Sequence, residues 1–344
     1  MSELRKRGRT GVIVLILAAA FSVPFWVAGF LTFQLAAAFS YAIALLGLTL
    51  ITGRAGLVSI GHSASFGVGA YTGVVLIWLL HMPYGWAIPA AAVTGFIFGA
   101  LVGLPITRLS KNRQSMVIVT LALAIAMPQI LKRFPEYTGG TNGVNVPTPA
   151  PPSVLPLAQD QWMYLLSLCL LLLMFWFCRN LLHGRIGRAM TAMRNHEVAA
   201  ATSGVNVPVY KLLAFAFGSM FAGVGGAVFV LVTQFANPDS FSLVLSITFL
   251  TGGIIGGIDS AFGAILGALF VEFVPVVTSD LAMAHDFPPA IIYAIVLVAV
   301  IFLMPDGLVG LATRVRRRRS AVNPVDGVDR TAAAVPSMQE EFAR

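Results

Sequence analysis

Residues 33–52 read FQLAAAFSYAIALLGLTLIT, and this stretch decides the class of fold. It contains no charged side chain, and a helix needs about 20 mostly apolar residues to cross the hydrocarbon core of a bilayer. The stretch is therefore long enough to span a membrane. The same length rule predicts about ten spans in all, at 11–30, 33–52, 63–81, 86–107, 115–131, 162–178, 211–233, 243–258, 261–278 and 288–304.

The composition of the whole chain also indicates that lipid surrounds most of it. Of 344 residues, 58% are hydrophobic and only 10% are charged, whereas a soluble domain carries about 25% charged residues. We therefore predict an all-α, polytopic integral membrane protein with about 10 transmembrane helices. Roughly eight would remain if two of the glycine-rich pieces are re-entrant.

The basic residues predict the orientation of these spans. The net charge is +8, and Arg and Lys lie in short clusters between the apolar runs, unlike the spread of a nucleic-acid-binding protein. With both termini in the cytoplasm, the clusters fall inside, and among the outer loops only 132–161 carries basic residues. The apolar stretch after the basic N-terminus continues well past Phe21, so we expect a retained first helix and not a cleaved signal peptide.

This orientation divides the chain into segments. We expect a basic cytoplasmic N-terminus, a transmembrane domain with one long outer and one long inner loop, and a tail that is basic and then disordered. Their bounds are 1–10, 11–310, 132–161, 179–210 and 311–344.

Several functional classes lack their signatures. Cys169 and Cys178 lie in one apolar run, which favours helix packing over a disulfide. No Cys/His cluster has metal spacing, and no catalytic constellation is present, so we expect neither a metal site nor an enzyme. The chain also has no Gly-x4-Gly-Lys-[Ser/Thr] phosphate loop, so we expect it to bind no cofactor and to hydrolyse no ATP.

Two features inside the spans are candidates for a translocation pathway. The first is the segment 53–73, where glycines alternate with polar residues, and such backbone is tolerated at membrane depth only where protein buries it or where it lines a cavity. A broken helix of this kind makes substrate sites in transporters; the alternative is close helix packing, with His62 bonded to a neighbour. The candidates here are Gly61, His62, Ser63, Ser65, Gly69 and Tyr71.

The second feature is Glu272, an acidic residue deep in an apolar span. An intramembrane carboxylate is a functional-site hypothesis by default. Alternatively, Glu272 satisfies backbone groups freed by Pro275, or it faces a partner subunit.

The inner loop is predicted to contain a helix from Ile186 to Ala201, ended by Gly204. A short helix with charged and small residues suits docking into a groove on a soluble partner. The alternative is an amphipathic helix lying on anionic lipid. The residues of interest are Arg188, Arg194, Glu197, Ala200 and Gly204.

A family resemblance decides between these two readings of the loop. The stretch 197–204 (EVAAATSG) resembles the Glu-Ala-Ala…Gly loop of ABC importer permeases. Three others, 53–71 (GRAGLVSIGHSASFGVGAY), 138–143 (TGGTNG) and 305–310 (PDGLVG), resemble LivM-type permeases of branched-chain amino-acid ABC transporters, as do 237–246 and 256–260. The resemblance runs in the family's order over about residues 35 to 310. It departs at Asp306, where the family often has Arg, and in the run Ser63 to Ser65, which is commonly Ala-rich.

The resemblance implies a type II ABC importer-like permease fold in a bacterial inner membrane. It implies a permease subunit for branched-chain or similar amino acids, with urea, short amides and aromatic acids as alternatives. It also implies several partners: a second, LivH-like permease, two cytoplasmic ATP-binding subunits that hydrolyse the ATP, and an external solute-binding protein. Homodimeric and heterodimeric pairing both stay open. The rival hypothesis is an ion-coupled secondary transporter that uses Glu272, His62 and Asp259.

Overall fold

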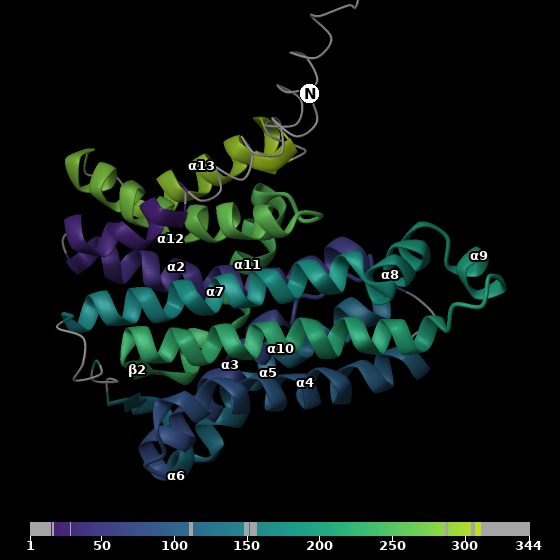
Figure 1. Ribbon diagram of the computed structural model, residues 1–344, viewed down its shortest axis with the longest axis horizontal. Coiled ribbons are helices and arrows are strands. Elements are labelled where there is room, and N and C mark those ends of the chain that lie inside the picture. Colours follow the sequence, from purple (N-terminus) through teal and green to yellow (C-terminus); the bar gives the residue numbers. More distant parts are fainter. Residues whose placement is uncertain are drawn as a thin grey trace, which may run out of the picture.

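The computed structural model describes residues 15, 17–27, 29–109, 113–147, 151, 157–285, 288–303 and 307–310. The predicted N-terminal segment 1–10 and the tail 311–344 lie outside these residues. The described part of the chain is mostly helical (Figure 1). Its long elements are α2 (Gly29–Leu48), η1 (Thr49–Arg54), α3 (His62–Val74), η2 (Val75–Leu79), α4 (Tyr84–Leu109), α5 (Arg113–Arg133), α7 (Gln159–His183), α10 (Val207–Thr233), α11 (Leu243–Gly256), α12 (Ala261–His285) and α13 (Pro289–Leu303).

The helices confirm the predicted membrane architecture. Among the described residues, seven helices are long and apolar enough to cross a membrane. Three shorter apolar helices, Leu17–Trp26, Leu243–Gly256 and Ile291–Val300, lie in the remaining predicted spans. Every predicted span thus contains a helix, and the chain is a multi-pass membrane protein.

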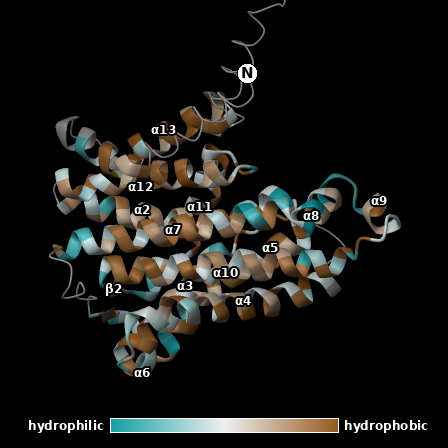
Figure 2. Ribbon diagram, viewed as in Figure 1, coloured by the Kyte–Doolittle hydropathy of each residue, from teal (hydrophilic) through white to brown (hydrophobic). Residues whose placement is uncertain are grey.

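The long helices form an inner group and an outer group. In α2 and α10, 83% of the apolar stretch is buried, against 28% in α4 and 33% in α7. α10 is central, because it packs against α2, α3 and α4. The outer helices expose large apolar side chains such as Ile97, Leu101 and Trp176, and apolar residues run the length of the bundle in Figure 2. These exposed side chains are suited to contact with lipid acyl chains.

Glycine lets the inner helices approach one another closely. A Cβ at Gly69 of α3 would overlap the backbone of Gly223 of α10. The same holds within the α11–α12 hairpin, where a Cβ at Gly256 would overlap Gly263. Small residues at such contacts are the usual means of packing helices in membranes, where the lipid gives no hydrophobic drive for association.

The two ends of the bundle differ. One end, here the α8 end, carries the short helices α8 (Arg185–Asn195) and α9 (Glu197–Thr202), which extend beyond the long helices. The other, the α6 end, carries α6 (Pro135–Thr138), η3 (Gly140–Asn142), η4 (Pro238–Phe241) and an antiparallel strand pair, β1 (Val144–Asn145) with β2 (Phe235–Ala236). A Lys132–Asp239 ion pair at 2.6 Å joins α5 to η4 there.

Candidate functional site

The predicted helix interruption lies at residues 55–61, between η1 and α3. The backbone there is irregular, and Ala55, Leu57 and Ser59 are buried while Val58 between them is 37% exposed. The Ile60 amide donates to Thr120 Oγ1 of α5 at 3.2 Å. Protein thus surrounds most of this non-helical segment, as irregular backbone at membrane depth requires.

The helix that follows begins well inside the bundle. Nε2 of His62 lies 2.8 Å from the carbonyl oxygen of Ala44 on α2. Along α2 and η1, Ala44 lies about 15 Å from Arg54, the last residue of η1. His62 is therefore well inside the bundle, away from the end of η1. From His62 onward, α3 and η2 run without a break to Leu79. The segment 53–73 is therefore an irregular entry followed by a continuous helix, and no second break lies within α3.

Three predicted polar residues at the start of α3, His62, Ser63 and Ser65, bond within the subunit. Ser246 Oγ of α11 lies 2.6 Å from Ser63 Oγ and accepts the Ser63 amide at 3.0 Å. Ser65 Oγ donates to Ser219 Oγ of α10 at 2.9 Å. These side chains, like that of His62, are buried. They join α3 to its neighbours and line no open surface of this subunit.

The other candidates of this segment are also packed. Tyr71 lies edge-on to Phe241, with ring centroids 5.6 Å apart. A Cβ at Gly61 would come within 2.5 Å of the Thr120 carbonyl oxygen. Two buried polar atoms, Nδ1 of His62 and the Tyr71 hydroxyl, have no hydrogen-bond partner among the described residues. Both atoms keep unused hydrogen-bonding capacity, so a pathway role for this segment stays a prediction.

Glu272 lies half-buried on α12, which packs against α2, α11 and α13. Within the part of the chain that the structure describes, its carboxylate has no hydrogen bond or ion pair, and no such bond joins it to His62 or Asp259. Asp259 pairs instead with Arg194. The arrangement therefore does not assemble the three ionisable residues of the secondary-transporter hypothesis into one site.

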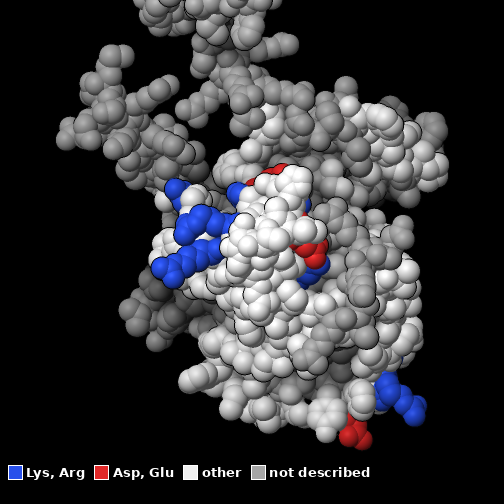
Figure 3. All heavy atoms as spheres, turned by 90° about the vertical axis from the view of Figure 1, so that its right-hand side faces the viewer, with Lys and Arg blue, Asp and Glu red and all other residues white. Residues whose placement is uncertain are grey.

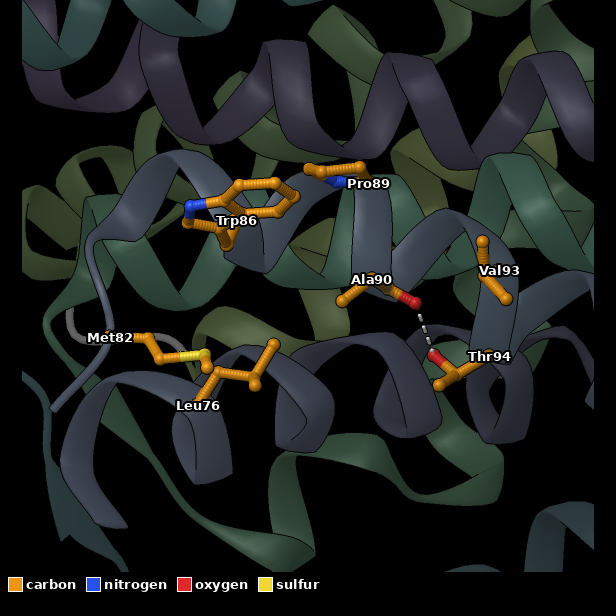
Figure 4. Close-up of a pocket in the computed structure, with 7 residues that line it drawn as sticks. All are labelled: Leu76, Met82, Trp86, Pro89, Ala90, Val93 and Thr94. Carbon is orange, nitrogen blue, oxygen red and sulfur yellow. Dashed lines mark hydrogen bonds between the residues drawn. The ribbon is translucent and has the colours of Figure 1, made fainter. Parts of the chain in front are cut away.

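A hollow of 540 Å³ lies between η2 and the start of α4 (Figure 4). Its walls are almost wholly apolar, with Trp86, Pro89 and Val93 among them. The hydroxyl of Thr94 already bonds to Ala90 O and Thr72 Oγ1. A free amino acid carries two charges that need polar partners when buried, so this hollow is suited to lipid and not to such a substrate.

The inner loop contains two helices where the sequence predicted one. The prediction of a single helix from Ile186 to Ala201 is wrong, because His196 adopts an extended conformation (φ −150°, ψ 98°) and separates α8 from α9. The break turns α9 back so that Glu197 pairs with Lys211 of α10 at 2.6 Å. Gly204 ends α9 as predicted, with φ +85°, a conformation that glycine adopts without strain.

α8 lies against the bundle by its apolar side. Met190 and Met193 are buried in a core cluster that includes Ile51 of η1 and Phe215 of α10. Its other side is basic, with Arg185 and Arg188 exposed. Figure 3 looks onto the α8 end and shows Lys and Arg gathered over one part of that face.

α9 presents small apolar side chains to its surroundings. Val198 is 78% exposed, and Ala199 and Ala201 are also exposed; we call these three residues the α9 surface. Ala200, predicted for this role, is instead buried within the chain. Residues three apart share a helix face, and Glu197 faces Lys211, so Ala200 also points inward. The sequence reasoning missed Val198, Ala199 and Ala201 for this reason.

The charged residues predicted for this loop all have partners in the chain. Arg188 Nη1 donates to His183 O at 2.9 Å. Arg194 turns toward the bundle, where its guanidinium bonds to Gly53 O and to the carboxylate of Asp259. Asp259 is 58% exposed, and a pair this exposed contributes at most about 1 kcal/mol to stability. Such contacts determine position more than they determine stability.

Comparison with known proteins identifies the family. Residues 30–305 match the family described as branched-chain amino acid transport system / permease component. The high-affinity branched-chain amino acid transport system permease protein LivM of Escherichia coli is 29% identical over 254 residues, which cover 67% of this chain and 59% of LivM. The corresponding LivH protein of Escherichia coli is 25% identical over 295 residues, covering 79% of this chain and 91% of LivH.

The chain thus spans less than two thirds of the length of LivM. A solved structure, PsaBC from Streptococcus pneumoniae in complex with Fab, has a TM-score of 0.40 and 12% identity over 83% of this chain and 94% of that chain, a likeness too distant to support a conclusion. The family match covers most of the chain, from the second residue of α2 to the end of α13. This chain belongs to the family of branched-chain amino acid transport system permease components.

Proposed function

We propose that this chain is a permease subunit of an ABC importer for branched-chain, or similarly apolar, amino acids in a bacterial inner membrane. The observation that carries the proposal is the α8–α9 pair. The pair extends from one end of the bundle and exposes the α9 surface. Met190 and Met193 of α8 attach it to the core of the bundle. The family membership supports the substrate class.

ATP hydrolysis belongs to separate subunits in this proposal. The sequence contains no phosphate loop, which supports the assignment of ATP binding and hydrolysis to two separate subunits. The α9 surface consists of small apolar side chains. Such a surface is suited to packing into a groove on an ATP-binding subunit.

The number of exposed arginines at each end supports the orientation. The α8 end exposes Arg185 and Arg188, whereas at the α6 end Arg133 is exposed and Lys132 pairs with Asp239. Basic residues favour the cytoplasmic side of a membrane protein. We place the α8 end in the cytoplasm and the α6 end outside, where a solute-binding protein delivers the amino acid.

The translocation pathway requires a second permease. His62, Ser63 and Ser65 are buried among helices of this subunit, which supports a role beside the pathway for these three residues. The pathway then runs between this chain and a related, LivH-like permease, and the half-buried carboxylate of Glu272 is a candidate contact there.

Reconstitution tests this function. The chain, its second permease and the ATP-binding subunits are placed in proteoliposomes. Uptake of radiolabelled leucine is measured with the cognate binding protein on the α6 side of the membrane and ATP on the α8 side. We expect uptake that needs ATP and that persists when ion gradients are dissipated. Uptake that follows a proton or sodium gradient without ATP would contradict the proposal.

Cysteine accessibility tests the orientation separately. Asn145 on β1 and Asn195 at the end of α8 are both exposed, so each accepts a cysteine that reagents can reach. In intact cells, an impermeant maleimide is expected to label Asn145→Cys but label Asn195→Cys only after lysis. Labelling of both from the same side would overturn the assigned topology.

A further inference from the structure

We propose that Arg194 is a transmission residue, which joins α8 to the end of η1 and to the α11–α12 turn, so that both move when α8 moves. We call Arg194, the Gly53 carbonyl and the Asp259 carboxylate the Arg194 clamp. The inference rests on the proposed function, because α8 transmits movement only if α8–α9 docks on an ATP-binding subunit.

The clamp joins three separate elements. Arg194 is near the end of α8, Gly53 is in η1 at the end of α2, and Asp259 is in the turn between α11 and α12. Nη1 of Arg194 donates to both acceptors, and Nη2 also donates to Asp259 Oδ2 at 3.3 Å. A planar guanidinium can hold two acceptors in a fixed arrangement, which the single ammonium of lysine cannot do.

The backbone around the clamp is shaped to admit the arginine. Gly56 has φ +68°, and a Cβ there would lie 2.7 Å from Cγ of Arg194. The arginine stem therefore lies directly over the glycine backbone, on the irregular segment that precedes α3. Any larger residue at position 56 would displace the arginine.

The two elements to which Arg194 bonds, η1 and the α11–α12 turn, also contact each other directly. A Cβ at Gly53 would overlap the Ile258 carbonyl oxygen and would lie 3.4 Å from Cα of Asp259. The end of η1 and the α11–α12 turn are thus in backbone contact, and Arg194 bonds to both sides of that contact. A rotation of α8 is then transmitted to the α11–α12 hairpin through this side chain, which also bonds to the end of η1.

The function of such a clamp lies in coupling. Two sites affect one another only through a physical element whose arrangement both of them bias. α8 also packs against α7, η1 and α10, with apolar contacts to η1 and α10, so loss of the clamp leaves α8 attached to the bundle. What is lost is the link from α8 to the α11–α12 turn, together with the hydrogen bond from α8 to η1.

The test compares leucine transported per ATP hydrolysed in the reconstituted complex. The variants are Arg194→Gln, Asp259→Asn and Gly56→Ala, which disturb the clamp from three sides. The matched control is Arg185→Gln, because Arg185 is an exposed arginine of the same helix with no hydrogen bond among the described residues. We expect Arg194→Gln to lower the ratio about fivefold, the factor that corresponds to about 1 kcal/mol, and the other two clamp variants to lower it less. Arg185→Gln is expected to keep the wild-type ratio.

The outcomes separate this inference from the proposed function. If the wild-type chain neither binds ATP-binding subunits nor supports ATP-driven uptake, the proposed function fails. If the wild type couples and Arg194→Gln couples equally well, with the ATP-binding subunits still attached, the clamp is refuted. Should Arg194→Gln not fold, as judged by size-exclusion chromatography, Asp259→Asn and Gly56→Ala decide: wild-type ratios in both would overturn the inference.

Discussion

The inner helices and the α8–α9 pair are held in place by opposite means. α2, α3 and α10 meet through glycines, with backbone against backbone and buried hydroxyls between them. The α8–α9 pair is held by a few apolar side chains and by two partly exposed ion pairs, Arg194–Asp259 and Glu197–Lys211. Close packing makes a rigid body, whereas partly exposed ion pairs are individually weak.

This difference teaches where function can be altered without loss of the fold. A packed contact between backbones has no room for a side chain, so a change there affects the whole subunit. The α8–α9 pair has few attachments, so a change there is expected to alter what the pair transmits while the bundle stays folded. The predictions below test this division from the largest effect to the smallest.

The largest effect is expected for Gly69→Val. The new side chain would overlap the Gly223 backbone of α10, and overpacking of this kind costs about 3 kcal/mol or more when backbone must move. We expect little monodisperse protein after detergent extraction, measured by size-exclusion chromatography. Gly85→Val is the control, because nothing lies within 4 Å of a Cβ at that exposed position. Equal yields of the two variants would show that α3 and α10 are loosely packed.

An intermediate effect is expected for Ala200→Glu compared with Ala199→Glu. Ala200 is buried and Ala199 is exposed, so only the first substitution buries an unpaired carboxylate, at a cost of about 2 kcal/mol. Ala200→Glu should lower the thermal stability of the isolated permease, and Ala199→Glu should leave it unchanged but weaken attachment of the ATP-binding subunit. The reverse order of stabilities would mean that α9 is turned the other way.

The smallest effect is expected for the Glu197–Lys211 pair. Glu197 is 56% exposed, and a double-mutant cycle with Glu197→Gln and Lys211→Gln should give a coupling energy below about 1 kcal/mol that declines with added salt. The measurement is thermal unfolding of each single variant and of the double variant. A salt-independent coupling of several kcal/mol would show that the pair is part of the packed core.

The membrane architecture could be predicted from the sequence because each span is a local property. A charge-free run such as 33–52 needs no distant partner to be recognised, and Gly204 ends its helix by its own conformation. The glycine-rich segment 53–73 was ambiguous, because broken backbone and close packing use the same residues. The structure shows both: irregular backbone at 55–61 and a packed helix from His62.

The contacts of the α8 end could not be predicted in the same way. Arg194 meets Gly53 and Asp259 across 141 and 65 residues of sequence, respectively, and no periodicity encodes such a pairing. The break at His196 also lacks a proline or glycine to mark it. The exposed and buried sides of α9 depend on where α10 presents Lys211, which only the folded chain determines.

Site-directed cross-linking from α9 tests the central claim, that this end of the bundle receives the ATP-binding subunit. Val198→Cys, at the most exposed position of the α9 surface, is treated with a short bifunctional reagent in membranes that contain the cognate ATP-binding and solute-binding proteins. The account predicts a cross-link to the ATP-binding subunit from position 198, and none from Asn145→Cys on β1 at the other end. A cross-link to the solute-binding protein from position 198, or to the ATP-binding subunit from position 145, would contradict it.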